Sequence, residues 1–324
     1  FSAILVFIIL WLTFSYYPIA HMVWYWAGPA AMIGAGKAVA AASGDAKAAA
    51  EAAMGTITSN AGLAFQWGAL DFAGGTVVHI NAGIAGLVAA LMVGKRVGFG
   101  KEAMPPHSLT LTLVGASLLW VGWFGFNVGS ALEAGATAAL AMINTFVATA
   151  AAALAWLIAE RMFKGKPSLL GAASGAVAGL VAITPAAGFA GPMGGIVLGI
   201  VAGLVCCFFC TAIKNALGYD DSLDVFGIHC VGGIIGAIGT GIVANPLFGG
   251  TSWFDYTANK VAEYDMIPQI ITQAKAVLLT LCWSALGTFL ILIVLRVVVG
   301  LRPSTDKERE GLDLVDHGER AYNY

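Results

Sequence analysis

The stretch DFAGGTVVHINAGIAG, residues 71–86, places an aspartate and a histidine in a segment that is otherwise apolar enough to dissolve in lipid. A second stretch, DVFGIHCVGGIIGAIG at 224–239, repeats the arrangement. An ionisable side chain inside a membrane helix costs at least about 2.5 kcal/mol, so it normally faces the interior of a helix bundle and serves a pathway. The two stretches therefore predict a membrane-embedded helix bundle with a polar path through it.

The composition supports a membrane location for the whole chain. Of the 324 residues, 59% are hydrophobic and only 10% are charged, and the mean hydropathy is +0.85. A soluble domain has roughly 45–50% apolar and 25% charged residues. We therefore expect a polytopic membrane protein. The net charge of −2, without any long run of like charges, excludes a surface for nucleic acid.

Eight segments are long enough to cross a bilayer, which takes roughly 17–25 residues in a helix. They lie at 1–17, 70–93, 110–130, 139–159, 168–185, 193–213, 225–244 and 267–299. The predicted fold class is an all-α, polytopic transmembrane helix bundle. We expect residues 1–299 to form the transmembrane domain and residues 300–324 to form a polar tail.

The basic residues separate the two sides of the membrane. Those of the first group lie in alternate short loops or in the tail: Lys95, Arg96, Lys101, Arg161, Lys164, Lys166, Lys214, Arg302, Lys307 and Arg309. Cytoplasmic loops carry the excess of Lys and Arg, so we expect a multi-pass protein of the cell inner (plasma) membrane with a cytoplasmic C-terminus. Phe1 lies directly in an apolar segment with no basic region before it, unlike a signal peptide, and we expect that an N-terminal part is missing.

Small residues predict close helix packing. Glycine recurs at every fourth position, at Gly171, Gly175 and Gly179 in one span and at Gly195, Gly199 and Gly203 in the next. This spacing lets membrane helices approach closely. The alanine-rich loop 30–65 is polar enough to stay out of lipid, and we expect it to form a surface helix.

The opening stretches also form an internal repeat. VHINAGIAG at 78–86 aligns with IHCVGGIIG at 228–236, sharing histidine, glycine and isoleucine in register. The charge pattern makes the two spans run in opposite directions, as in an inverted repeat, whose site lies near the middle of the membrane. His79 and His229 would then face each other and share a hydrogen bond, and they could relay a proton. The alternative is that each is a core residue bonded to a backbone carbonyl.

Asp71 lies eight residues before His79, about 80° around a helix and about 12 Å along it. Two interpretations stay open and are compatible. Asp71 can cap the helix by accepting hydrogen bonds from free backbone amides, or its charge can favour a cation at the outer mouth or relay a proton. Asp224, which begins the second repeat stretch, is expected to be a cap alone.

Aromatic residues gather near the outer ends of two spans. Trp123, Phe126 and Ser130 approach the outer end of one span, and Trp24 lies just beyond the outer end of the first. An aromatic face with a hydroxyl can hold a small cation. The alternative is an interfacial belt of aromatic residues.

Several long motifs resemble the ammonium transporter family (the Amt/MEP/Rh group), in its bacterial Amt type. They are LDFAGGTVVHINAGIAGLVAAL (70–91), WFGFNVGSA (123–131), GKPSLLGAASGAVAGLVAITPAAGF (165–189), DVFGIHCVGG (224–233) and EREGLDLVDHGERAYN (308–323). The resemblance implies a homotrimer of eleven-helix protomers in membrane lipid, each with a narrow apolar pore. The eight spans would be the last eight helices, and the first three would be missing.

The resemblance also implies roles for individual residues. His79 and His229 match the twin pore histidines, Trp24 and Ser130 the outer recruitment site for ammonium, Phe126 a gating phenylalanine, Trp123 a pore-wall tryptophan and Asp71 the aspartate needed for transport. The second gating phenylalanine would lie in the missing helices. A nitrogen signal protein of the PII type would dock at the cytoplasmic face and tail.

The expected mechanism follows from desolvation costs. A bare ammonium ion meets a large penalty in an apolar pore, whereas neutral ammonia does not. We therefore expect capture of ammonium, deprotonation, passage of ammonia and movement of the proton along the histidines. An ammonium sensor and a passive ammonia channel of the same fold are the alternatives. No nucleophile–base pair or metal cluster accompanies the histidines, so we expect no enzymatic activity, no metal and no cofactor.

Overall fold

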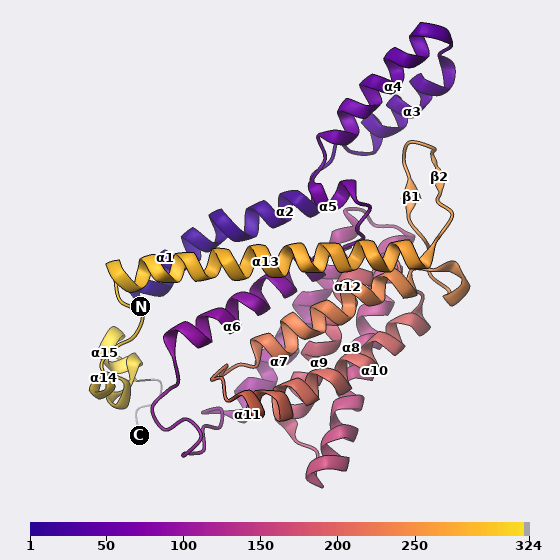
Figure 1. The fold of residues 1–324 in the computed structure, drawn as a ribbon. Coiled ribbons are helices and arrows are strands. Elements are labelled where there is room, and N and C mark those ends of the chain that lie inside the picture. Colours follow the sequence, from indigo (N-terminus) through magenta and orange to yellow (C-terminus); the bar gives the residue numbers. More distant parts are fainter. Residues whose placement is uncertain (321–324) are drawn as a thin grey trace.

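The structure, a computed structural model, describes residues 1–320; residues 321–324, the end of the predicted tail, lie outside the described residues. It is a bundle of long helices (Figure 1), and eight segments within it are long and apolar enough to cross a membrane. All eight predicted spans are helical. The helices of these spans are α1 (Ser2–Trp11), α2 (Tyr17–Trp24), α6 (Asn81–Val93), α7 (Leu109–Asn127), α8 (Ala136–Lys164), α9 (Leu169–Ile183), α10 (Pro192–Phe208), α12 (Val231–Val243) and α13 (Met266–Val298).

Short elements extend or join these helices. Four are π-helical: η1 (Leu12–Tyr16), η2 (Gly75–Ile80), η5 (Phe209–Ile213) and η6 (Phe226–Cys230). Three are 3₁₀ turns: η3 (Gly129–Ala131), η4 (Thr184–Ala186) and η7 (Pro246–Phe248). The others are α3 (Pro29–Ala41), α4 (Gly44–Ser59), α5 (Leu63–Gln66), α11 (Lys214–Leu217), α14 (Thr305–Glu310), α15 (Leu312–His317) and the antiparallel strands β1 (Phe254–Asp255) and β2 (Lys260–Val261).

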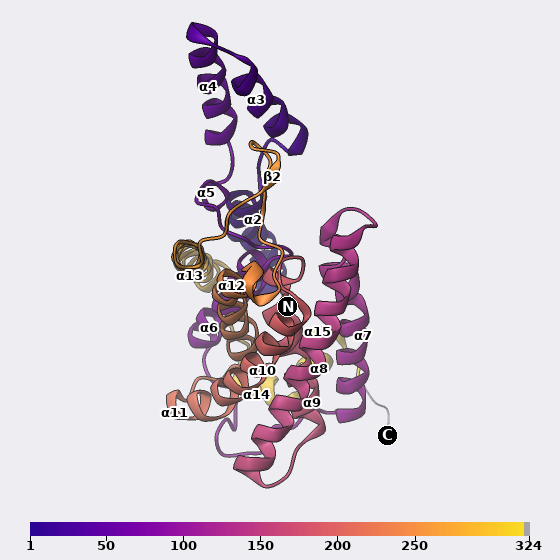
Figure 2. The ribbon, with the colours of Figure 1, turned by 90° about the vertical axis from the view of Figure 1, so that its right-hand side faces the viewer.

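The two ends of the bundle differ. Helices α3 and α4 project from one end, beside the β1–β2 hairpin, and α14 and α15 lie at the opposite end (Figures 1 and 2). The single surface helix predicted in residues 30–65 is wrong, because the two long helices α3 and α4 form there, followed by the start of α5 at Leu63. The chain breaks between them at Ser43, which is extended, and Gly44, whose φ of +56° is left-handed. Trp24, predicted just beyond the first span, is the last residue of α2.

The predicted glycine packing is confirmed. Gly175 and Gly179 of α9 and Gly199 and Gly203 of α10 all lie against the backbone of α8, where Ala148 and Ala152 leave room. A Cβ atom at any of these four glycines would overlap α8. The three helices therefore pack at backbone contact, which is how small residues promote association in lipid.

The two repeat helices cross through matching glycines. Gly83, four residues after His79, lies against the backbone of Cys230, and Gly233, four residues after His229, lies against Ile80 and the Cβ of His79. Helices α6 and α12 run in opposite directions (Figure 1). Each glycine thus contacts the residue that directly follows the histidine of the other repeat: Cys230 for Gly83 and Ile80 for Gly233. This reciprocity is expected of an inverted repeat.

The tail is attached to the loops at its end of the bundle. The carboxylate of Glu308 in α14 accepts the N–H of Val97 at 2.7 Å and pairs with Arg302 at 2.7 Å. These two donors lower the pKa of Glu308. In the adjoining loop Arg96 binds the buried Asp220 through its Nε and Nη2 atoms at 2.7–3.1 Å. Glu308 therefore fastens the tail to a loop that is itself fixed by an ion pair.

We predict that Gly83→Ala lowers the thermal midpoint of the protein in detergent or lipid, with a cost of about 1–3 kcal/mol, because overpacking a backbone contact forces a shift. The matched control is Gly125→Ala in α7, where an added Cβ meets nothing within 4 Å. Both changes raise helix propensity equally. Equal midpoints for the two variants would contradict the crossing described above.

We predict that Glu308→Gln releases α14 at neutral pH, increasing hydrogen exchange over residues 305–317 severalfold. The folded pKa of Glu308 is lowered, so its stabilisation is complete above the unfolded value of about 4.3 and is lost as pH falls through the folded value. The unaltered tail should therefore stay attached near pH 5 and detach in stronger acid. Asp306→Asn, in the same helix, is the control. Equal hydrogen exchange in both variants would disprove the proposed attachment of the tail through Glu308.

Candidate functional site

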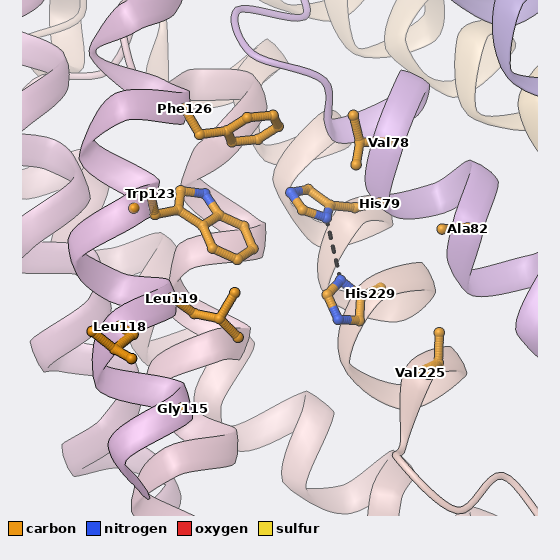
Figure 3. Close-up of a pocket in the computed structure, with 11 residues that line it drawn as sticks. Val78, His79, Ala82, Gly115, Leu118, Leu119, Trp123, Phe126, Val225 and His229 are labelled. Carbon is orange, nitrogen blue, oxygen red and sulfur yellow. Dashed lines mark hydrogen bonds between the residues drawn. The ribbon is translucent and has the colours of Figure 1, made fainter. Parts of the chain in front are cut away.

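His79 and His229 face each other, each from a π-helical segment at the start of a repeat helix. His79 in η2 is 3% exposed, and its Nδ1 lies 3.2 Å from the Nδ1 of His229 in η6, as Figure 3 shows. Single π-helical turns inside α-helices occur frequently at functional sites. The two residues are called the histidine pair below. The dashed line in Figure 3 marks the contact between their two Nδ1 atoms.

Two aromatic residues of α7 cover one side of the histidine pair. The indole of Trp123 stacks on His79 with ring centroids 5.1 Å apart and an interplanar angle of 14°. Phe126 meets the rings of both His79 and Trp123 edge-on, at 5.9 and 5.7 Å (Figure 3). These contacts fix the plane of the His79 ring, which determines where its two nitrogens point.

The histidine pair opens on a cavity of about 710 Å³. The rest of its lining is apolar or glycine, apart from the indole of Trp123: Val78, Ala82, Gly115, Leu118, Leu119, Gly122, Phe126 and Val225. Such walls accept a small neutral molecule and penalise a bare ion. Within residues 1–320, no group of three or more His, Cys, Asp or Glu side chains is arranged to hold a metal ion.

Sequence reasoning missed Thr184, which joins the site from η4. Its hydroxyl accepts the indole N–H of Trp123 at 3.0 Å and lies 3.3 Å from the Nε2 of His79. The signal in the sequence is the Thr184–Pro185 pair at the end of the predicted span 168–185. A proline there ends the α-helix, and α9 indeed stops at Ile183, directly before Thr184.

Asp71 caps η2 completely. Its carboxylate accepts the N–H groups of Gly74, Gly75 and Thr76 at 2.6–2.8 Å, together with the hydroxyl of Thr76. This confirms the capping interpretation of Asp71. The Asp71 carboxyl group lies at the N-terminal end of η2, and its effect on a cation or a proton stays a prediction.

The loop that carries Asp71 is held by Gln273, another residue that the sequence analysis missed. The amide of Gln273 in α13 accepts the N–H of Leu70 at 2.7 Å and donates to the carbonyls of Leu70 and Ala237 at 2.7 and 2.8 Å. A buried amide with its oxygen and nitrogen both satisfied by backbone fixes the chain strongly. The cap of η2 is therefore fastened to α12 and α13.

The expected capping role of Asp224 is wrong. The N–H of Phe226, in the first turn of η6, bonds to Asp221 at 2.8 Å, while Asp224 pairs with Lys214 at 2.7 Å. Asp221 precedes His229 by eight residues, as Asp71 precedes His79. Asp224 corresponds instead to Gly74, and both have left-handed backbones, with φ of +55° and +115°. Extending the repeat register backwards would have identified Asp221.

Trp24 and Ser130 make hydrogen bonds to different partners. The indole N–H of Trp24 donates to the backbone carbonyl of Asp71 at 2.9 Å, and its ring packs on Gly74. The hydroxyl of Ser130 donates to the carbonyl of Phe126, one turn back, at 2.9 Å. Trp24 is thus attached to the cap of η2 and Ser130 to the end of α7, and neither hydrogen bond joins the two residues.

Comparison with known proteins identifies the family. The family model described as Ammonium Transporter Family matches residues 1–322. An ammonium transporter of Aquifex aeolicus is 47% identical over 323 residues, covering 100% of this chain and 65% of that protein. One from Bacillus subtilis is 41% identical over 322 residues, covering 99% of this chain and 69% of that protein. The chain thus spans about two thirds of the length of these relatives, which are named transporters and not enzymes.

Solved structures agree with the sequence comparison. Saccharomyces cerevisiae Mep2 superposes with a TM-score of 0.75 at 32% identity, over 94% of this chain and 61% of Mep2. A protein described as Sensor Amt Protein superposes with a TM-score of 0.72 at 25% identity, over 89% of this chain and 74% of that one. The inverted-repeat helix bundle is therefore an integral membrane fold with several spans, and the chain belongs to the ammonium transporter family.

Proposed function

We propose that the protein transports ammonium by recruiting the ion at the outer face, deprotonating it, and conducting ammonia past Phe126 and the histidine pair. The observation that carries the proposal is a pair of imidazoles, 3.2 Å apart, in a cavity whose other walls are almost wholly apolar. Imidazole is the side chain whose protonation changes most readily near neutral pH. The pair supplies a proton relay in a cavity whose lining, among the described residues, holds no carboxylate, lysine or arginine.

Desolvation explains why ammonia would pass and an alkali cation would not. A cation entering among Val78, Leu118, Leu119 and Val225 loses its hydration shell and gains few oxygen or nitrogen ligands in return. Ammonium can leave its proton behind and proceed as a neutral molecule, whereas potassium cannot. The desolvation barrier thus selects ammonium over potassium because ammonium can lose a proton. It does not require a binding site matched to the radius of one ion.

The outer end of the path would lie at the cap of η2. Two groups there would attract a small cation: the carboxylate of Asp71 and the ring of Trp24. The indole N–H of Trp24 donates a hydrogen bond to the backbone carbonyl of Asp71. Ser130 and Phe126, which close the end of α7, would complete the recruitment site. Trp123 would form the wall beyond it.

The distribution of basic residues sets the proposed orientation, and exposed apolar side chains indicate the proposed contacts with lipid and other subunits. The loops with most of the basic residues lie toward the end that carries α14 and α15 (Figure 1), so we place that end in the cytoplasm, with residues 1–299 as the transmembrane domain of an inner-membrane protein. Exposed apolar side chains along α7 and α8, including Val121 and Phe146, fit contact with lipid and with neighbouring subunits of a homotrimer. The cytoplasmic face and tail would receive a PII-type signal protein.

We predict that replacing His79 and His229 with alanine reduces ammonium-driven current in proteoliposomes by at least about tenfold, or abolishes selectivity over potassium. A positioned proton-transfer group contributes at least this much. The current is recorded on a solid-supported membrane. The control is His21→Ala, which removes an exposed histidine stacked on Tyr25 outside the cavity.

A parent protein that binds ammonium but carries no current would contradict transport. That result would favour a sensor, the function by which one of the similar solved proteins, Sensor Amt Protein, is described. Ammonia flux without net charge movement would favour a passive channel. Full current and unchanged selectivity in the double variant would reject the histidine pair as the relay.

A separate test distinguishes the two interpretations of Asp71. Asp71→Asn removes the charge and leaves one carbonyl oxygen for the cap, so we expect a loss of stability of about 0.5–2 kcal/mol. If the charge also recruits ammonium, half-saturation of the current should rise severalfold. The control is Asp221→Asn, which weakens the equivalent cap of η6 at the other end of the path. Equal half-saturation in both variants would leave Asp71 as a cap alone.

A further inference from the structure

We infer that Thr184 is a positioning residue that sets which nitrogen of each histidine carries a proton. The inference itself rests on the hydrogen bonds around Thr184. Its consequence for proton movement rests on the transport function proposed above.

The hydroxyl hydrogen of Thr184 is directed toward Leu180. Pro185 has no N–H to continue the helix, and the N–H of Thr184 bonds to the carbonyl of Val181, three residues back. The carbonyl of Leu180 accepts the Thr184 hydroxyl instead, at 2.7 Å. A hydroxyl has one hydrogen and two acceptor lone pairs. Thr184 therefore faces the rest of the site as an acceptor.

The remaining contacts of Thr184 agree with this polarity. The indole nitrogen of Trp123, which can only donate, lies 3.0 Å from the Thr184 oxygen. The second lone pair of that oxygen faces the Nε2 of His79 at 3.3 Å. His79 must then carry its proton on Nε2 to make a hydrogen bond.

The tautomer of His79 determines that of His229. A neutral imidazole protonated on Nε2 is an acceptor on Nδ1. The Nδ1 of His79 lies 3.2 Å from the Nδ1 of His229, so His229 donates from Nδ1 and keeps its Nε2 bare. Figure 3 shows this second nitrogen of His229 on the side of its ring away from His79. It is an acceptor available to the N–H of a molecule in the cavity.

The tautomers that Thr184 favours are the end state of an inward proton transfer along the histidine pair. An inward proton transfer begins from the reversed arrangement: His79 Nε2 takes a proton, His79 Nδ1 passes its proton to His229 Nδ1, and His229 Nε2 releases one. The pair ends in the arrangement that Thr184 favours. A return to the reversed arrangement must precede the next transfer, and Thr184 opposes it unless its hydroxyl turns from Leu180 to His79. Thr184 thus sets the energy difference between the two arrangements.

The test is ¹⁵N solid-state NMR of histidine-labelled protein in lipid bilayers without ammonium, because protonated and bare imidazole nitrogens resonate far apart. The signals of the pair, among five histidines, are identified by their loss in His79→Gln and His229→Gln. We expect protonated Nε2 on His79 and protonated Nδ1 on His229, with a population ratio of about fivefold or more over the reverse, as one hydrogen bond supplies.

Thr184→Val should bring this ratio toward one, and Thr184→Ser, which keeps the hydroxyl, should restore it. Trp123→Phe removes a donor to Thr184 but leaves the hydroxyl, so it should preserve the assigned tautomers. A bare Nε2 on His79 in the parent protein overturns the inference even if the valine variant fails to fold. An unchanged ratio in a folded valine variant also overturns it. The assigned tautomers without any ammonium current would overturn the transport proposal alone.

Discussion

A reciprocal contact between two glycines and two histidine-bearing turns holds the repeats together at the site. Gly83 lets the backbone of Cys230, one residue beyond His229, come close, and Gly233 makes room for the side chain of Ile80, one residue beyond His79. With the two repeats this close, the Nδ1 atoms of the histidines lie 3.2 Å apart. In lipid the apolar environment gives little drive to bring helices together, so backbone packing at small residues must supply it. The polar site is thus a product of steric fit between apolar helices.

Both repeat segments begin with backbone N–H groups that have no partner within the helix, and in both a carboxylate accepts from the first turn. Asp71 and Asp221, each eight residues before a histidine, bond to the first turn of η2 and η6. Unsatisfied amides in a membrane cost several kcal/mol each. The carboxylates therefore have a structural task before any transport task. In both repeats the carboxyl group that bonds to the first turn also lies at an end of the proposed path.

The sequence predicted the spans and the facing of the histidines because hydropathy and repeat register are local patterns. It did not predict Thr184 or Gln273, since their roles depend on which helices become neighbours and no spacing encodes that. Asp224 was chosen over Asp221 because the repeat was followed for too few residues. The two helices in 30–65 were missed at Ser43 and Gly44, although serine before glycine is a recognisable break between helices.

A histidine pair suits an apolar cavity better than a single ionisable residue does. Each neutral imidazole satisfies one nitrogen of the other, so neither requires a buried counter-charge. Thr184 satisfies the outermost nitrogen, which leaves one acceptor for whatever occupies the cavity. Trp123 and Phe126 hold the His79 ring by stacking and edge contact and add no charge. On the proposed function, a proton can therefore move through neutral side chains in walls that would reject a cation, so the same surroundings that exclude potassium make the relay feasible.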